Sequence, residues 1–120
     1  MAVHPTAIVE DGARLGAGVE IGPYCIVGRD AVLGDGVRLL SHAIVSGKTT
    51  IGANTIVHPH AVLGGEAQIY NNDAPEARLE IGSGNTIREA VTINLGSKKG
   101  RGVTRRGNNC FLMAGSHIGH

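Results

Sequence analysis

Two histidines close the sequence in a His-x-x-His arrangement, at His117 and His120. An imidazole has a reference pKa of about 6.5, so it can accept a proton at neutral pH and return it to a leaving group. The residue type therefore suits a general base. Spacing alone more often reflects a solvated histidine near a chain end. The residues by themselves leave both interpretations open.

A strongly basic stretch precedes these histidines. Between residues 94 and 106 it contains five cations and no acidic residue, namely Lys98, Lys99, Arg101, Arg105 and Arg106. Its glycines do not form a phosphate-binding P-loop, and no dinucleotide-binding pattern occurs in the chain. It also lacks the aromatic side chains that stack on nucleobases, so we expect no nucleic-acid partner. A solvated loop and a docking site for an acidic partner both remain open.

A third group of residues shares a spacing of 18. His42 and His60 are 18 residues apart, and so are Tyr24 and His42. If 18 residues make one structural repeat, these side chains form a surface column with rings about 4.8 Å apart. Two stacked imidazoles could begin a metal site, and β-helical carbonic anhydrases place zinc between histidines. Plain surface stacking is the favoured interpretation, and we predict no metal cofactor.

The composition restricts the scaffold that can hold these groups. The chain has 120 residues, 19 glycines, 2% aromatic residues and a net charge of +1. That length corresponds to one domain, and the scarcity of rings predicts a core of small repeated units. No apolar run reaches the 18 to 20 residues of a membrane span, and the N-terminal residues do not resemble a secretory signal. We expect a reduced, cytoplasmic protein.

A six-residue repeat determines the architecture. Every sixth residue from Val3 to Leu63 is Val, Leu or Ile, a run of eleven that chance would produce in roughly one sequence in a million. A small or β-branched residue lies four positions after most of them, and both Cys25 and Cys110 fall in that position. We therefore predict that the cysteines fill the core rather than bind metal.

The repeat is interrupted twice. Ile81, Ile87 and Ile93 stay in phase with Leu63, so the segment at about 65–79 loops out without loss of register. A second loop is expected at about 94–105, after which the period resumes one residue out of phase at Leu112. Three hexads make one coil of 18 residues, and stacked coils pair through their backbones. The sequence predicts a single all-β domain over 1–120, a parallel β-helix of triangular section with five to six coils.

These hexads resemble those of the left-handed β-helix acyltransferases, and left-handedness is implied by that resemblance. Three stretches are similar to the UDP-N-acetylglucosamine O-acyltransferases of lipid A biosynthesis. They are 3–9 with 21–25, 79–93, and 112–120 with its final His-x-x-His. The resemblance implies transfer of a (3-hydroxy)acyl chain from acyl carrier protein to the 3-hydroxyl of UDP-N-acetylglucosamine. It also implies a cytoplasmic homotrimer with active sites between subunits and no cofactor.

The resemblance assigns roles to the candidate residues. His120 matches the family's general base and His117 its substrate-lining partner, while Gln68 matches the one retained residue of a Gln-Asp-Leu-Lys substrate motif. The basic segment, Lys98, Lys99, Arg101, Arg105 and Arg106, would dock the carrier protein or its phosphopantetheine.

The chain departs from the family's pattern at two loops and at its end. Ile69, Tyr70 and Asn71 replace the acid and the lysine of the first motif, and Asn94 replaces a histidine near the second loop. The family continues past the position of His120, so we expect a truncated chain that is inactive alone. The alternatives are a related transferase with another sugar-nucleotide or amine acceptor, a metal-dependent β-helix hydratase, and a non-catalytic β-helix.

Overall fold

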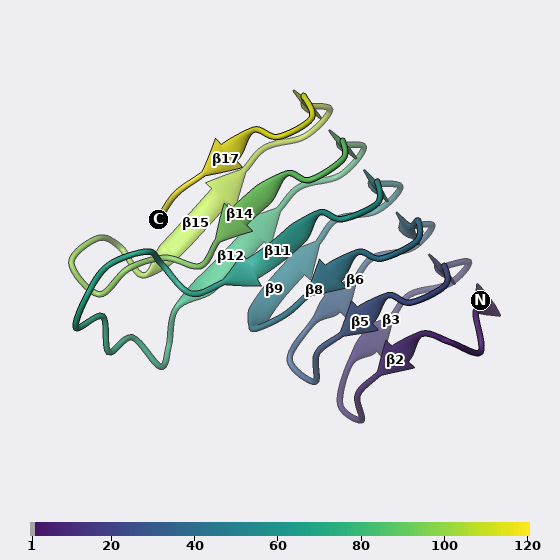
Figure 1. Ribbon diagram of the computed structural model, residues 1–120, viewed down its shortest axis with the longest axis horizontal. Helices are drawn as coiled ribbons and strands as arrows, with labels where there is room; N and C mark the ends of the chain where they lie inside the picture. Colours follow the sequence, from purple (N-terminus) through teal and green to yellow (C-terminus); the bar gives the residue numbers. More distant parts are fainter. Residues whose placement is uncertain (1) are drawn as a thin grey trace.

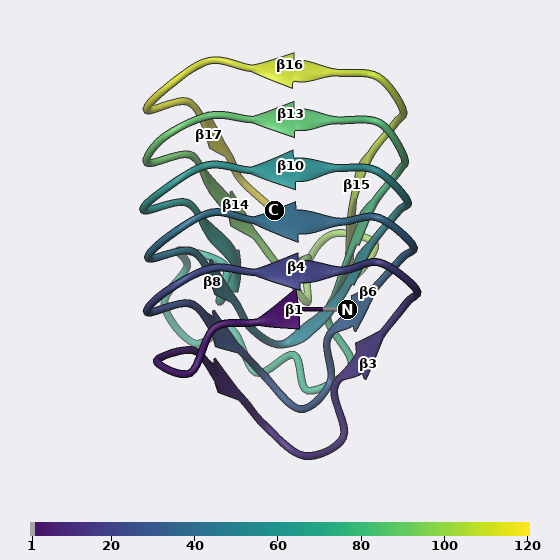
Figure 2. The same cartoon turned by 90° about the vertical axis from the view of Figure 1, so that its right-hand side faces the viewer.

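Residues 2–120 form a stack of triangular coils in the computed structural model, which describes these residues (Figures 1 and 2). The coils measure 38 × 30 × 20 Å along the principal axes. All regular structure in this range is β-strand, and every strand pair is parallel. The predicted all-β fold, a parallel β-helix, is confirmed. None of the described residues forms a helix with the length and hydrophobicity needed to cross a bilayer.

Each side of the triangle is one parallel sheet, here named sheets A, B and C. Sheet A contains β1 (Ala2–Val3), β4 (Glu20–Ile21), β7 (Arg38–Leu39), β10 (Ile56–Val57), β13 (Thr86–Ile87) and β16 (Phe111–Leu112). Sheet B contains β2 (Ile8–Val9), β5 (Ile26–Val27), β8 (Ile44–Val45), β11 (Val62–Gly65), β14 (Thr92–Asn94) and β17 (His117–Ile118). Sheet C contains β3 (Arg14–Leu15), β6 (Val32–Leu33), β9 (Lys48–Ile51), β12 (Arg78–Ile81) and β15 (Val103–Arg106).

The hexad explains why most strands contain only two residues. The first residue of such a strand points outward and the second points into the stack, where side chains such as Leu33, Leu39 and Leu63 are buried. The small residue of the hexad, for example Ala43 or Ala61, is also buried and fills the corner. Because the interior is a narrow column, aliphatic and small side chains fill it completely and no ring is needed.

The register confirms the predicted coil of 18 residues. Ala2 pairs with Glu20, and Ile8 pairs with Ile26 in the next sheet. The coil lengthens where the chain loops out, since Ile56 pairs with Thr86 across the first excursion. Val3 is 41% exposed although it belongs to the inward column, because the first coil has a neighbour on one side only.

Two excursions leave the stack at the ends of neighbouring strands in sheet B. The first runs over residues 66–77, between β11 and β12, and the second runs over 95–102, between β14 and β15. They project from the stack beside each other (Figure 1), and the backbone N–H of Lys98 donates to the Asn72 Oδ1 at 2.9 Å. Gly64 lies where the first excursion begins, with φ of +91°, and a Cβ there would collide with the Ser46 carbonyl oxygen. Only glycine fits this position.

The later coils are joined by a buried polar side chain. The Asn85 amide nitrogen donates to the carbonyl oxygens of Gly82 at 3.0 Å and Gly107 at 2.9 Å. Its Oδ1 accepts the N–H of Cys110 at 2.7 Å. Asn85 is 2% exposed, so its three bonds replace those that water would make and fix the last coil on the one before it.

Candidate active site

His117 begins β17 and points outward from sheet B. Its backbone pairs in register with Thr92 of β14, and the N–H of Thr92 donates to the Ser116 carbonyl oxygen at 3.1 Å. The side chains meet as well, because Thr92 Oγ1 and His117 Nδ1 lie 2.7 Å apart. The imidazole is therefore attached to the neighbouring coil at one nitrogen, which leaves Nε2 as its other polar atom.

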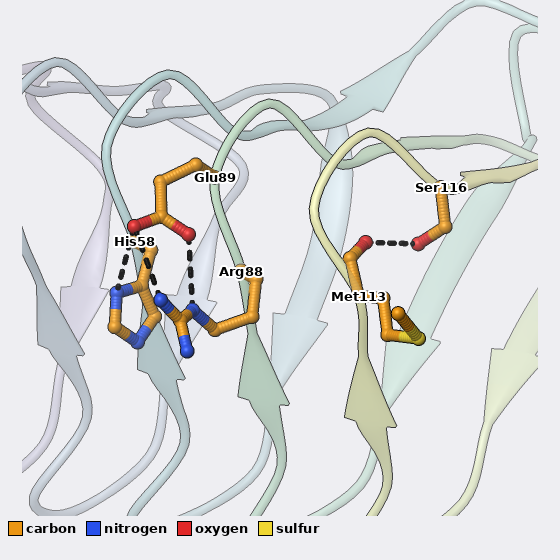
Figure 3. A network of polar contacts seen from close by, with 5 residues as sticks. All are labelled: His58, Arg88, Glu89, Met113 and Ser116. Atoms are coloured by element: carbon orange, nitrogen blue, oxygen red, sulfur yellow. Dashed lines mark hydrogen bonds and ion pairs between the residues drawn. The ribbon is translucent and has the colours of Figure 1, made fainter.

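The corner that leads into β17 is closed by a side chain (Figure 3). The Ser116 hydroxyl donates to the Met113 carbonyl oxygen at 2.7 Å, and the N–H of Gly115 donates to the Glu89 carbonyl oxygen at 2.9 Å. The first bond fixes the side chain of Ser116, the residue before His117, and the second fixes the backbone of the turn that contains Gly115. The direction in which His117 leaves the corner is consequently fixed by the fold.

The equivalent corner of the preceding coil is held by charge (Figure 3). The Glu89 carboxylate accepts from Arg88 Nε at 2.9 Å and lies 4.0 Å from His58 Nδ1. The hydrogen bond from Arg88 lowers the pKa of Glu89 below its ordinary value and favours the ionised form. Arg88 in turn lies over the Phe111 ring, 5.9 Å from its centre. Together these contacts order the turn that leads into Thr92.

His120 lies two residues after the end of β17 and is exposed. It follows a sheet B strand at the same end where the two excursions follow β11 and β14. Since the strands are parallel neighbours, their carboxyl ends lie at one edge of the sheet. The topology thus brings His120, the second excursion and the first excursion, in that order, to consecutive positions along one corner of the stack (Figure 1).

Gln68 is exposed on the first excursion. It lines a shallow hollow of about 260 Å³ together with Ala67, Ile69 and Tyr70, and Tyr70 is 97% exposed. Ile69 and Tyr70, which stand in place of the family's motif residues, therefore border the same hollow as Gln68. Asn94, at the end of β14, is 6% exposed and its amide nitrogen has no hydrogen-bond partner among residues 2–120.

The basic residues divide into two groups. Lys98, Lys99 and Arg101 are exposed on the second excursion, where Lys98 and Arg101 line a groove of about 330 Å³ between the two excursions. The predicted loop extended too far, because Arg105 and Arg106 lie on β15. Pairing of β15 with β12 ends the excursion at Val103 and places Arg105 opposite Glu80 in the ladder.

Glu80 ties the second group to sheet C. Its carboxylate accepts from Arg105 Nε at 2.9 Å and lies 3.4 Å from Arg78 Nε. The hydrogen bond from Arg105 lowers the pKa of Glu80, which favours the ionised carboxylate. Arg105 is engaged within the chain, whereas the cations of the excursion project into solvent.

The ring column is confirmed at the corner between sheets A and B. The Tyr24 and His42 ring centres are 5.2 Å apart, and those of His42 and His60 are 5.0 Å apart. All three residues have positive φ, between 58° and 67°, which turns each ring out onto the surface. Within residues 2–120 no group of three or more His, Cys, Asp or Glu side chains could hold a metal ion.

The two predicted core cysteines differ in burial. Cys25 is fully buried, and burial raises the pKa of its thiol, so the neutral form fills the corner. Cys110 has the same position within its hexad but lies at another corner, directly before β16 of sheet A in the last coil, and is partly exposed. Thr92 and Ser116, which hold His117, were not predicted from the sequence. The second excursion lengthens the spacing between Thr92 and His117 to 25 residues, so the 18-residue period does not align them.

Comparison with known proteins agrees with this architecture. Residues 30–65 match the family described as bacterial transferase hexapeptide (six repeats). The chain superimposes on the UDP-N-acetylglucosamine acyltransferase of Bacteroides fragilis with a TM-score of 0.95 and 36% identity, covering 98% of this chain and 46% of that one. The chain is a left-handed hexapeptide β-helix. For the O-acyltransferase of Moraxella catarrhalis the TM-score is 0.96 with 41% identity, over 100% and 47% of the two chains.

The hexapeptide β-helix is also similar in sequence to curated relatives. The acyl-(acyl-carrier-protein)–UDP-N-acetylglucosamine O-acyltransferase of Rickettsia canadensis is 49% identical over 118 residues, which make up 98% of this chain and 45% of that sequence. The resemblance predicted from three short stretches is confirmed over nearly the whole chain. The chain spans less than half the length of the relatives that it matches.

Proposed function

We propose that this β-helix is part of an acyltransferase that moves a (3-hydroxy)acyl chain from acyl carrier protein to the 3-hydroxyl of UDP-N-acetylglucosamine, at the start of lipid A biosynthesis. The observation that carries the proposal is the 49% identity, over 98% of this chain, to the Rickettsia canadensis enzyme of that name. The fold supports it, since the superimposed acyltransferases match with TM-scores of 0.95 and 0.96.

In this proposal His120 is the general base. Its imidazole removes the proton from the sugar 3-hydroxyl as the hydroxyl oxygen attacks the thioester carbonyl carbon. The tetrahedral intermediate then collapses, the carbon–sulfur bond breaks, and the protonated imidazole returns the proton to the leaving thiol. The acyl group arrives activated as a thioester, so the transfer balances without a metal or organic cofactor. His120 is exposed at the edge of sheet B from which the two excursions leave, so a large acyl donor such as a carrier protein can approach it.

The excursions supply the proposed substrate contacts. Gln68 contributes a neutral donor and acceptor to the sugar nucleotide. Lys98, Lys99 and Arg101, exposed on the second excursion, attract the acidic carrier protein. Arg105 and Arg106 complete the basic docking surface from β15, although Arg105 is also paired with Glu80. The contribution of Arg105 to docking should accordingly be smaller than that of Lys98 or Arg101.

The outer face of sheet B is the proposed contact between subunits of a homotrimer. Ile8, Ile26, Ile44 and Val62 point outward from paired strands and form an apolar ladder. Ile8 is 57% and Ile26 is 39% exposed, an arrangement that is costly in water and typical of a covered face. The ladder ends at Thr92 and His117, which would place the chemistry at the boundary between subunits in the cytoplasm.

Residues 1–120 are proposed to be one β-helix domain that does not turn over without the remaining part of the enzyme. A chimera tests the reaction directly. This chain replaces the matching 118 residues of the Rickettsia canadensis enzyme, and acylation of UDP-N-acetylglucosamine by 3-hydroxyacyl carrier protein is measured. His120→Ala removes the base, and His4→Ala, on the first coil, is the matched histidine control.

The expected result is turnover by the chimera and by the His4→Ala variant, with a loss of about 100- to 10,000-fold in His120→Ala. A panel of other sugar nucleotides and of amine acceptors is run in parallel. Acylation of one of these in preference to UDP-N-acetylglucosamine would overturn the substrate assignment. Equal activity of the His120→Ala variant would overturn the assignment of the base.

A further inference from the structure

The His117 ring makes one side-chain hydrogen bond among the described residues, between its Nδ1 and the hydroxyl of Thr92. We propose that Thr92 is a positioning residue, whose hydroxyl donates to His117 Nδ1 and selects the tautomer that carries its proton on Nε2. The inference rests on the proposed function for its role in catalysis. The hydrogen bond and the tautomer can be tested without any substrate.

The backbone brings the pair together with little freedom. Thr92 and His117 are directly paired in the ladder between β14 and β17, and their polar atoms lie 2.7 Å apart. Ser116 fixes the corner before His117 through its hydroxyl bond to Met113. Both partners therefore start from ordered backbone, and the hydrogen bond has to restrict only one or two side-chain torsions on each side.

The direction of the hydrogen bond follows from what surrounds the hydroxyl. A threonine hydroxyl has one hydrogen to donate, and Nδ1 of His117 is its hydrogen-bond partner among residues 2–120. The next outward residue in the sheet is Val62, an apolar side chain. When a second subunit covers this face, a hydroxyl that only accepted from Nδ1–H would leave its own hydrogen without a partner, which is costly. Donation from Thr92 to Nδ1 satisfies both groups.

The two histidines, His117 and His120, consequently have different roles. With Nδ1 occupied as an acceptor, His117 presents Nε2–H as a hydrogen-bond donor toward a substrate oxygen. His120 lies beyond the strand and has no such partner within the described residues, so it is available to accept a proton. One threonine on the adjacent strand thereby distinguishes the donor histidine from the base histidine.

The tautomer is measured by nitrogen-15 NMR of the histidine rings in the 120-residue chain, at a concentration at which sedimentation velocity shows the chain to be self-associated. A His117→Gln spectrum identifies the His117 signals. Thr92→Val removes the hydroxyl at nearly constant shape, and Thr92→Ser retains it. The unchanged chain and Thr92→Ser should show the proton on Nε2, whereas Thr92→Val should show a mixture of tautomers. A proton on Nδ1 in the unchanged chain, or identical spectra for Thr92→Val, would overturn the proposal.

Turnover in the chimera separates positioning from packing. Thr92→Val should lower kcat by about three- to tenfold with KM within twofold, and Thr92→Ser should restore kcat, because one hydrogen bond is lost and regained. Equal kcat in Thr92→Val would contradict the positioning role even if the protein is fully folded by circular dichroism. A chimera that does not acylate any acceptor, with the predicted tautomer intact, would instead refute the proposed function.

Discussion

The outer faces of sheets B and C differ although the same hexads build both. Sheet B presents, in register, Ile8, Ile26, Ile44, Val62, Thr92 and His117. Sheet C presents Arg14, Val32, Thr50, Glu80 and Arg105 at the equivalent positions. Inside the stack the two sheets are alike as far as β12, where the inward residue is aliphatic in both, and they differ at β15, where Arg106 of sheet C takes the register position of Ile81. The repeat therefore constrains the inward residue and leaves the outward one free to specialise.

The specialisation gives each face a different role. Glu80 bridges Arg78 and Arg105 on sheet C, so charged side chains occupy that face, which suits contact with water. Sheet B has no charged residue among its outward positions before His117, and its isoleucines remain partly exposed. A face with this pattern is typical of an interaction surface, which fits the proposed contact between subunits.

Truncation inside and outside the stack should separate the shared core from the specialised surface. Leu63 is fully buried and Val62, its neighbour on β11, points outward. Leu63→Ala should destabilise the chain by about 2–5 kcal/mol, because the interior cannot collapse onto the cavity. Val62→Ala should cost under about 1 kcal/mol. Urea unfolding measures the free energy of unfolding of both variants. Equal decreases in that free energy would show that the inward column is not the source of stability.

A charge placed on each face should distinguish the two surfaces. Ile44→Lys introduces an ammonium in the middle of the apolar ladder, and Thr50→Lys introduces the same group on sheet C. The first should weaken self-association roughly a hundredfold or more, because an unpaired buried charge costs several kcal/mol. The second should leave association within about twofold. Sedimentation velocity over a range of concentrations measures both, and a larger effect from Thr50→Lys would exchange the roles of the faces.

The smallest effect concerns the ion pairs of sheet C. Arg105 lowers the pKa of Glu80 from its ordinary value of 4.5, so folding favours the carboxylate. The resulting stabilisation is present above pH 4.5 and is lost as the pH falls through the lowered folded pKa. Glu80→Gln should reduce the urea midpoint slightly at pH 7, and the difference from the unchanged chain should vanish in strong acid. A difference that grew on acidification would contradict the assignment.

Much of the fold could be predicted because its main determinant is local and repeated. The six-residue spacing identifies the inward column from Val3 to Leu63, and the 18-residue coil predicts the stacked rings of Tyr24, His42 and His60. The period constrains each coil independently, so an interruption displaces the later coils without removing the pattern. The phase before and after the first excursion is an example, since Leu63 and Ile93 still pair in sheet B.

The site was less predictable because its contacts cross the excursions. Thr92 meets His117 at a separation of 25 residues, and Glu80 meets Arg105 at the same separation. The second excursion adds seven residues to the 18-residue coil and so gives the separation of 25. The six-residue period does not predict the length of this insertion. The basic loop is also shorter than the sequence predicts, since pairing of β15 with β12 depends on backbone register rather than on residue type. The outward ladder on sheet B, in contrast, is spaced by 18 up to Val62 and is visible in the sequence.

If the proposed function is correct, assembly and chemistry share the outer face of sheet B. The most direct test is turnover by the chimera carrying Ile44→Lys or Thr50→Lys, measured at a subunit concentration at which the unchanged chimera is assembled. Neither residue lies beside His117 or His120, so a loss of activity has to act through assembly. We expect Ile44→Lys to abolish acyl transfer and Thr50→Lys to retain it within about twofold. Full activity of a dissociated Ile44→Lys chimera would show that chemistry does not depend on assembly through this face.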